Sequence, residues 1–380
     1  MLIYFSLFQI CLIVVAVVYL GVNAPFLLKV EAFSGSLGDS PLISVCVPAR
    51  NEERDIEACL TSLLSQDYPR FEVIVVDDNS TDRTPEIIKG LQKRFPKLTA
   101  IQGASLPSDW YGKPFALHQA SQKAQGDLLL FTDADPVFGP KALSTAAYLF
   151  QKHQLDMLTL LPGAEFGSFW ERTVQPVIFA FIAALTRFRK VNNPKSDAAM
   201  GVGAFIMARR EVYDRVGGHQ SLKQTILEDI GMAHLLKQAG AKIMIADGRN
   251  IYSIRMYHSL KEIWIGWRKN VFLAMKKSTF KTFYYIFWIL GFLVTPWLVV
   301  AVHLWMDSPP MWQGLALAGL AMVWISQATL CYELRLKQRN ALLFPLGALV
   351  MVAIMINSMI HVLFRGQAEW RGRTYKQPER

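Results

Sequence analysis

Four long apolar stretches constrain the fold of this 380-residue chain more than any other feature of its sequence. Residues 1–28 are almost uninterrupted apolar, and residues 283–305, 311–332 and 341–364 follow near the other end. A helix of about 20 apolar residues spans the hydrocarbon core of a bilayer, so each stretch is long enough to cross. The chain is 52% hydrophobic and 18% charged, too apolar for one ordinary soluble domain and too charged for a protein wholly in the membrane. Membrane segments attached to a soluble domain are therefore predicted.

The first stretch is predicted to form a transmembrane helix within residues 1–29, joined to the soluble domain by a linker at 30–40. A cleaved signal peptide is less favoured, because the run is too long and has neither a basic n-region nor a clear small-residue cleavage site. Residues 169–188 are also apolar but are interrupted by polar residues. A helix lying on the membrane surface and a buried core helix are both open for this segment.

The basic residues give the chain a formal net charge of +10 and gather beside the apolar segments. An anionic cytoplasmic leaflet is favoured as their partner over nucleic acid, because no zinc-finger spacing or aromatic-basic signature accompanies them. A multi-pass protein of the cell membrane with a cytoplasmic domain is expected. Three crossings after that domain would place the basic tail, residues 365–380, outside, against the positive-inside rule. One of the three C-terminal segments is therefore expected to be re-entrant or interfacial.

Short apolar runs alternate with helical stretches between residues 41 and 153. Strands are expected at 42–47, 71–76, 98–102 and 128–132, and the helices that follow them at 55–65, 85–95, 114–124 and 140–153. This alternation predicts an α/β fold, with a mostly parallel sheet covered by helices and ligands at the carboxyl ends of the strands. Further strands are expected at 157–161, 205–208 and 242–246 and a helix near 228–238, where the sheet is expected to become mixed.

Two aspartates one residue apart end the fourth expected strand. Asp133 and Asp135 follow the apolar run at 128–130. Carboxylate oxygens suit Mg²⁺, which proteins commonly hold with one or two carboxylates and the oxygens of a bound phosphate. The alternative is a turn in which these aspartates bond their own backbone, which is ordinary chemistry for Asp before Pro. Taken alone, the motif leaves both open.

Polar turns follow the first two expected strands. Residues 48–53 read P-A-R-N-E-E and residues 77–82 read D-D-N-S-T-D. An acid at the end of the second strand would suit a dinucleotide-binding domain, but the first turn lacks the glycines that such a fold needs beside the pyrophosphate. Acids paired at a strand end can instead accept hydrogen bonds from a base N–H or from ribose hydroxyls.

Two further polar positions lie at the starts of expected helices. Lys113 could meet a diphosphate there, helped by the helix N-terminus, or could be a solvated surface lysine. Glu228 and Asp229 could cap a helix or interact with its dipole. Alternatively, Asp229 is a general base, because a carboxylate with an ordinary pKa is ionised at neutral pH and can take a proton from a hydroxyl.

Taken in order, five motifs resemble the inverting family 2 glycosyltransferases over about residues 41–275. They are P-A-R-N-E at 48–52, V-D-D-N-S-T-D at 76–82, G-K at 112–113, D-A-D at 133–135 and E-D at 228–229. The N-terminal anchor, W-Y-G-K at 110–113, R-M-Y at 255–257 and E-W-R-G-R-T-Y at 369–375 are similar to membrane-bound members that glycosylate lipids. Those members are the carotenoid-acid glycosyltransferases and, more distantly, the hopanoid-pathway and ceramide glucosyltransferases.

The resemblance implies a GT-A fold at residues 41–275, a nucleotide-sugar donor, expected to be a UDP-sugar, and Mg²⁺ or Mn²⁺ as cofactor. The apolar segments that follow predict a membrane region at 276–364. The residues that would hold the nucleoside are Ala49, Arg50, Glu52 and one or both of Asp77 and Asp78. The residues with the other implied roles are Lys113 near the donor, Asp133 and Asp135 at the nucleotide–metal site, and Asp229 as catalytic base.

One departure from the family pattern bears on the product. Polysaccharide synthases of the family carry Q-x-x-R-W, whereas residues 264–270 here read W-I-G-W-R-K-N, so a polymerase is disfavoured. Trp264 and Trp267 could cover the acceptor or anchor the protein at the membrane interface. Glu228 and Arg268 are further candidate contacts to the acceptor or the donor.

The expected function is transfer of one sugar, with inversion, from the nucleotide sugar to a membrane lipid by metal-assisted single displacement. A hydroxyl acceptor is favoured over the carboxylic acid of a carotenoid acid, because an acid is already deprotonated at neutral pH and hardly needs a base. Two alternatives are transfer to a polyprenyl phosphate and a non-enzymatic membrane binding or transport protein. The latter is disfavoured, because the C-terminal segments contain few ionisable residues, mainly His303 and His361.

Overall fold

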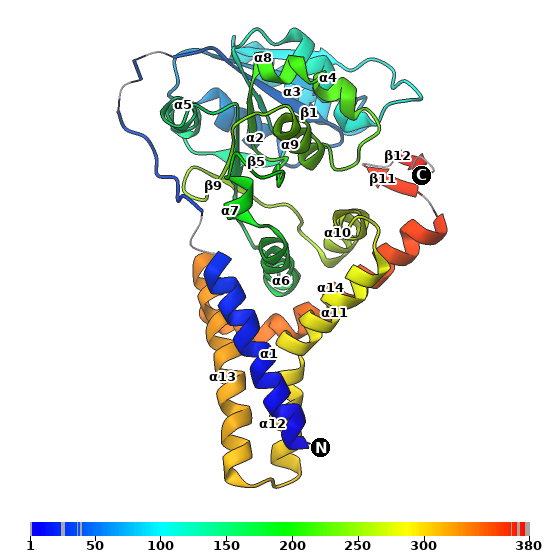
Figure 1. The fold of residues 1–380 in the computed structure, drawn as a ribbon. Helices are drawn as coiled ribbons and strands as arrows, with labels where there is room; N and C mark the ends of the chain where they lie inside the picture. Colours follow the sequence, from blue (N-terminus) through cyan, green and yellow to red (C-terminus); the bar gives the residue numbers. More distant parts are fainter. Residues whose placement is uncertain are drawn as a thin grey trace.

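The computed structural model describes residues 2–23, 27–35, 37, 38, 40–365, 367–370 and 373–376. An α/β domain stands on a group of helices that continue away from it as a narrow bundle (Figure 1). The sequence predicted this division into a mixed domain and apolar helices.

A seven-stranded mixed sheet forms the centre of the α/β domain. Its order is β3 (Leu98–Gln102), β2 (Phe71–Asp77), β1 (Ile43–Ala49), β4 (Leu128–Phe131), β8 (Ile206–Arg209), β6 (Met157–Leu161) and β9 (Ile243–Asp247). β1 pairs in parallel with both β2 and β4, whereas β8 runs antiparallel to β4 and β6. The expected strands are confirmed to within two residues at most ends, and so is the mixed second half.

Alternate side chains of each central strand enter two different hydrophobic cores. In β2, Val73 and Val75 belong to one core, and Ile74 and Val76 belong to the other. Successive side chains of a strand point to opposite faces of the sheet, so a strand covered by helices on both faces is apolar throughout. The covering helices are α2 (Ile56–Leu64), α3 (Thr84–Arg94), α4 (Gly112–Lys123), α5 (Ala142–Lys152), α7 (Phe188–Val191), α8 (Arg210–Arg215) and α9 (Glu228–Gln238).

A small second sheet, which the sequence did not predict, follows the D-A-D motif at once. It joins β5 (Pro136–Phe138), β10 (Tyr252–Ile254) and β7 (Gly163–Ala164) in that order. The rings of Phe138 and Tyr252 stack with centroids 5.4 Å apart. Residues 132–135 are thus held between the end of β4 in one sheet and the start of β5 in another.

A layer of helices lies directly below the α/β domain and is here called the platform. It consists of α6 (Phe169–Leu185), α10 (Leu260–Ala274), α11 (Thr279–Leu293) and α14 (Phe344–Arg365), which share one buried apolar cluster. A capping box formed by Ser168 and Glu171 begins α6, and Val174 and Ile178 bury one face of that helix. The segment expected at 169–188 therefore contains a helix, Phe169–Leu185, with one buried face, which does not decide between the two expectations.

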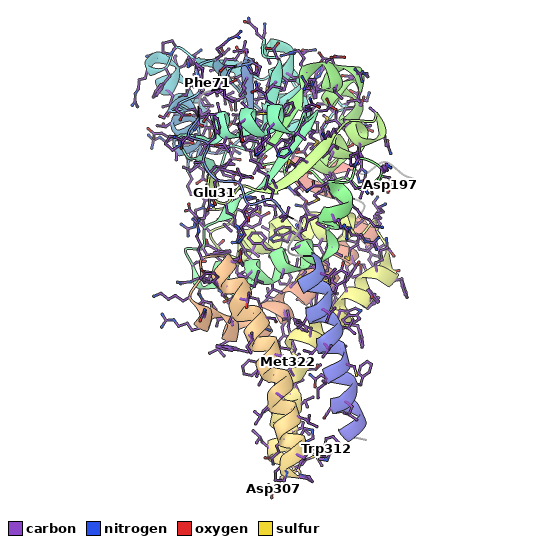
Figure 2. The ribbon with its side chains drawn as sticks, turned by 60° about the vertical axis from the view of Figure 1, so that its left-hand side comes forward. Glu31, Phe71, Asp197, Asp307, Trp312 and Met322 are labelled. Atoms are coloured by element: carbon purple, nitrogen blue, oxygen red, sulfur yellow. The ribbon has the colours of Figure 1, made fainter. Side chains whose placement is uncertain are left out.

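Three helices form the bundle that extends beyond the platform: α1 (Leu2–Asn23), α12 (Thr295–Trp305) and α13 (Pro310–Glu333). Ser6 on α1 lies 2.9 Å from Nε2 of His303 on α12, and Gln9 donates to Thr295 at 3.0 Å. Figure 2 shows Asp307 at the end of the bundle farthest from the domain.

Among the described residues, α13 and the stretch from Gln338 to Phe364 are the two helices long and apolar enough to cross a membrane. The pair α11 and α12 adds a third candidate if it counts as one span, but it bends by 47° at its break. The short helix η3 (Gln338–Leu343) leads into α14, which packs against α6 and α10 and runs obliquely away from α13 (Figure 1).

Both segments that flank the apolar helices touch the α/β domain. After α1, Val30 donates a backbone hydrogen bond to Asp247 at 2.8 Å, and Phe33 stacks on Tyr148 with ring centroids 4.2 Å apart. The expected linker at 30–40 is therefore docked along the domain where the structure describes it. After α14, a hairpin of β11 (Gln367–Trp370) and β12 (Arg373–Lys376) turns back toward the domain (Figure 1).

Candidate active site

The sheet brings three of the sequence motifs to one edge. β2, β1 and β4 are parallel neighbours, so the turns that follow them, at 78–82, 50–53 and 132–135, emerge side by side. The carboxyl ends of parallel strands are where open α/β sheets bind ligands. These turns and the residues beside them form two adjoining groups of side chains.

The first group lies after β1 and β2. Arg50 Nη1 donates to the backbone carbonyls of Asp78, at 2.5 Å, and Asn79, at 3.0 Å. The Asp78 amide donates to the carbonyl of Ala49 at 2.8 Å, which ties the two turns together. Glu52 is buried beside them.

The two aspartates of this first group keep unused acceptor atoms. Asp77 Oδ1 accepts from the amide of Ser80 at 3.1 Å, and Asp78 is 1% exposed. Asp77 Oδ2 and Asp78 Oδ1 are buried without a hydrogen-bond partner among the described residues. Burial raises the pKa of Asp78, and the guanidinium groups of Arg373 and Arg50 oppose that rise. Two buried acceptors at one strand end suit a ligand that carries N–H or O–H donors.

The second group surrounds Lys113 at the start of α4. Lys113 Nζ lies 2.6 Å from Asp133 Oδ1 and 2.6 Å from Glu228 Oε1. Its side chain is 18% exposed, so the lysine is no solvated surface residue. Burial works against its positive charge, but the negative charges of Asp133 and Glu228 outweigh this and raise its pKa well above the usual value.

Asp229 completes the second group at the N-terminus of α9. Its Oδ2 accepts from the amide of Gly203 at 3.0 Å and its Oδ1 from the amide of Ile230 at 2.8 Å. Burial, reinforced by the charge of Glu228 and opposed by that of Lys113, raises the pKa of Asp229 to about 6. The carboxylate is thus held in one orientation and is still mainly ionised at neutral pH.

Asp133 and Asp135 offer two hard oxygen donors one residue apart. The thiol of buried Cys59 points at the carbonyl of Asp133, at 3.7 Å, and so supports this turn from below. No group of three or more His, Cys, Asp or Glu side chains suited to an ion occurs among the described residues. The pair fits a Mg²⁺ or Mn²⁺ ion whose remaining ligands are diphosphate oxygens and water, which is how proteins commonly hold Mg²⁺.

The remaining candidates on α10 lie in the platform. Trp264 Nε1 donates to Asn357 on α14 at 3.2 Å, and Trp267 is 8% exposed within the platform cluster. The carbonyl of Arg268 accepts from the hydroxyl of Ser358 at 2.5 Å. All three residues therefore contribute to packing between α10 and its neighbours, apart from any contact with a substrate.

Two features of the site and one ion pair outside it were missed from the sequence. A Cβ atom at Gly203 would lie 3.1 Å from Lys113 Nζ, 3.2 Å from Asp133 Oδ2 and 3.4 Å from Asp229 Oδ2, so this glycine sits among all three. Arg373 reaches Asp78 from the C-terminal hairpin. Arg255, noted only as part of a motif, pairs with Glu171 through two hydrogen bonds of 2.9 and 3.0 Å.

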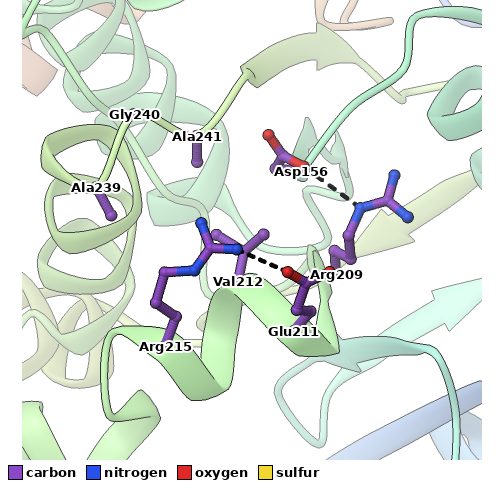
Figure 3. Close-up of a pocket in the computed structure, with 8 residues that line it drawn as sticks. All are labelled: Asp156, Arg209, Glu211, Val212, Arg215, Ala239, Gly240 and Ala241. Atoms are coloured by element: carbon purple, nitrogen blue, oxygen red, sulfur yellow. Dashed lines mark hydrogen bonds and ion pairs between the residues drawn. The ribbon is translucent and has the colours of Figure 1, made fainter.

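A separate pocket lies at the opposite edge of the sheet, near the start of β6 and the end of β8 (Figure 3). Two ion pairs line it, between Arg209 and Asp156 at 3.3 Å and between Arg215 and Glu211 at 2.7 Å. None of the site residues predicted from the sequence lines it.

Comparison with known proteins adds a family and a fold. Residues 44–217 match the family described as Glycosyl transferase family 2. A 4,4'-diaponeurosporenoate glycosyltransferase of Staphylococcus haemolyticus is 24% identical over 356 residues, with 88% of each chain covered. A beta-monoglucosyldiacylglycerol synthase of Synechocystis sp. is 33% identical over 196 residues, which is 50% of this chain and 39% of that protein.

Among solved structures, the chain is similar to a mannosyltransferase from Pyrobaculum calidifontis in complex with GDP-Man and Mn²⁺. The TM-score is 0.55 at 18% sequence identity, and the match covers 96% of this chain and 99% of the other. This likeness confirms the predicted GT-A fold.

Proposed function

Because this chain carries a family 2 glycosyltransferase domain and is a glycosyltransferase, we propose that it moves one sugar from a nucleotide sugar to a lipid hydroxyl at the cytoplasmic face of the cell membrane. The observation that carries the proposal is the group formed by Lys113, Asp133, Glu228 and Asp229. The cation of Lys113 pairs with the acids Asp133 and Glu228, and Asp229 lies beside them around Gly203, next to the turns that hold buried acceptors.

The nucleoside of the donor, for which UDP is the proposed carrier, would occupy the first group of residues. Asp77 Oδ2 and Asp78 Oδ1 would accept from its donors, with Arg50 and Glu52 fixing the turns. Asp133 and Asp135 would hold Mg²⁺ or Mn²⁺, which neutralises charge on the diphosphate when bound. Lys113 lies beside Asp133 and adds a positive charge near the leaving group.

The proposed reaction is one displacement at the anomeric carbon. The acceptor oxygen forms a bond to that carbon while the bond from the carbon to the diphosphate oxygen breaks, which inverts the configuration. Asp229 takes the proton of the acceptor hydroxyl. Two backbone amides fix its orientation, and a pKa of about 6 leaves it ionised at neutral pH yet more basic than an exposed aspartate.

A lipid acceptor is supported by the helices below the site. The platform and the bundle carry long apolar surfaces, and α14 lies against α6 and α10 beside the domain. The names of the two relatives, a diaponeurosporenoate glycosyltransferase and a glucosyldiacylglycerol synthase, describe enzymes that act on lipid-type acceptors. Since Asp229 serves a hydroxyl better than a carboxylic acid, the hydroxyl remains the proposed acceptor.

The test uses the full-length protein in detergent with a panel of nucleotide sugars, a membrane lipid extract and MgCl₂. Nucleotide release that depends on the lipid, together with a glycolipid product that resists mild acid, is the expected result. A product labile in mild acid would point to a polyprenyl phosphate acceptor instead. Asp229→Asn should abolish transfer and preserve donor binding, and unchanged transfer in this variant would remove Asp229 as the base.

A further inference from the structure

The C-terminal hairpin reaches the α/β domain through a shielded ion pair. Arg373 Nη1 on β12 lies 2.5 Å from Asp78 Oδ2, although 295 positions separate the two residues in sequence. The side chain of Asp78 is 1% exposed and that of Arg373 is 20% exposed. Exposed ion pairs contribute little to stability, but an ion pair at a buried carboxylate is costly to break from one side.

Only one of the two oxygens of the Asp78 carboxylate has a hydrogen-bond partner in the described part of the chain. Arg373 occupies Oδ2, whereas Oδ1 is buried with no hydrogen-bond partner in the described part of the chain. A buried acceptor without a donor costs about 1–3 kcal/mol, so this atom marks a place where a ligand donor fits. The neighbouring Asp77 Oδ2 is also buried without a hydrogen-bond partner among the described residues. Both atoms belong to the turn proposed above to face the donor nucleoside.

We propose that the C-terminal hairpin is part of the donor site and that Arg373 is a positioning residue, which holds Asp78 so that its other oxygen receives the donor nucleoside. The inference rests on the proposed function, because it requires a nucleoside diphosphate as ligand. One carboxylate serves both the hairpin and the nucleotide, so docking of the hairpin and binding of the nucleotide strengthen each other by the same factor.

The platform connects this arrangement to the membrane-facing helices. The hairpin begins directly after α14, and α14 packs against α6 and α10. Arg373 is therefore positioned by helices that bind lipid in the proposed function. Donor binding accordingly depends on a residue that lies far from the α/β domain in sequence but contacts it in space.

Binding of UDP and of GDP, side by side with MgCl₂, to the full-length protein in detergent tests the proposal. Arg373→Ala should lower the affinity for whichever nucleotide binds by roughly tenfold or more, the scale seen when one partner of a buried charge pair is removed. Arg373→Lys should restore part of the affinity, because it keeps the charge without the planar fork. The control Arg215→Ala breaks the ion pair to Glu211 at the opposite edge of the sheet and should leave affinity unchanged (Figure 3).

Two further readouts separate positioning from general damage. Arg373→Ala should raise the KM for the donor and leave the KM for the acceptor unchanged. Amide exchange in the peptide that contains Arg373–Lys376 should slow when the nucleotide is added to the wild-type protein and should not respond in the variant. In an Asp78→Asn background, Arg373→Ala should have little further effect on affinity, because the carboxylate through which it acts is gone.

The outcomes separate the role of Arg373 from the proposed function. If neither nucleotide binds the wild-type protein, the proposed function fails. If a nucleotide binds but Arg373→Ala binds it equally well, or the hairpin exchanges at the same rate with and without it, the role of Arg373 is refuted while the proposed function stands. The double variant Asp78→Asn/Arg373→Ala carries neither charge of the ion pair, so its affinity can be compared with that of Asp78→Asn even if Arg373→Ala alone folds poorly.

Discussion

Gly203→Ala should slow sugar transfer without unfolding the protein. The added methyl carbon would lie 3.1 Å from Lys113 Nζ, 3.2 Å from Asp133 Oδ2 and 3.4 Å from Asp229 Oδ2, closer than ordinary van der Waals contact for at least the first two. These side chains would have to yield by a few tenths of an ångström. A misplacement of about 1 Å can cost 100-fold in rate, so we expect kcat to fall roughly tenfold. Because flexible side-chain ends can absorb the shift, the free energy of unfolding should change by less than about 1 kcal/mol.

The measurement is nucleotide release at saturating donor and lipid, with thermal unfolding recorded for the same preparations. Gly90→Ala is the matched control, because a Cβ atom at this exposed position of α3 would meet no atom within 4 Å. That variant should keep wild-type kcat and gain about 0.5–1 kcal/mol of stability, because alanine is the better helix former. Wild-type kcat in Gly203→Ala would refute the view that Lys113, Asp133 and Asp229 act as one close-packed catalytic group.

Three further predictions concern Lys113, the ion pair of Glu171 with Arg255, and the proposed metal site. Lys113→Met removes the cation between Asp133 and Glu228, so transfer should fall at least about 100-fold and stability by about 3 kcal/mol, as measured by nucleotide release and denaturant unfolding. Burial opposes ionisation of Glu171, but the hydrogen bonds from Arg255 and from backbone amides outweigh it and lower its pKa from 4.5 to about 2. A depressed pKa stabilises the fold above pH 4.5, so wild type should exceed Glu171→Gln by about 3 kcal/mol at neutral pH, and denaturant unfolding should show this difference shrinking as the pH falls toward 2. A chelator should abolish transfer, and added MgCl₂ or MnCl₂ should restore it; full activity in the chelator would argue against an ion at Asp133 and Asp135.

The strands of the main sheet were predictable because each is apolar along its whole length. A strand such as β1 is buried at every position, so it appears in the sequence as a short continuous apolar run. The small sheet was not predictable on this basis. Its strands β5 and β10 are three residues long and pair across more than 100 positions, so neither leaves a local period to detect. Their pairing depends on the tertiary fold.

The same distinction applies to the site. Asp77, Asp133 and Asp229 follow strands or open a helix, and such places can be read from local pattern because parallel strands end at one edge. Gly203 and Arg373 belong to the site only because the fold brings them close to residues that are distant in sequence. A glycine in a loop gives no sign of what its missing side chain leaves room for, and an arginine in a basic tail gives no sign of a partner 295 positions away.

The positive-inside rule left one problem, since three crossings after a cytoplasmic domain would export a basic tail. The ion pair between Arg373 and Asp78 removes the need for the third crossing, because it joins the tail to the α/β domain. A helix whose end is tied to the domain cannot also carry that end through a bilayer. We therefore infer that α14, despite its length, lies along the membrane surface with α6 and α10, while α1, α12 and α13 enter the membrane. A cysteine-labelling reagent that cannot cross the membrane tests this order: in intact cells it should reach Asp307→Cys between α12 and α13, and it should not reach Lys376→Cys in the tail. Labelling of the tail residue from outside would overturn both the topology and the contact with Asp78.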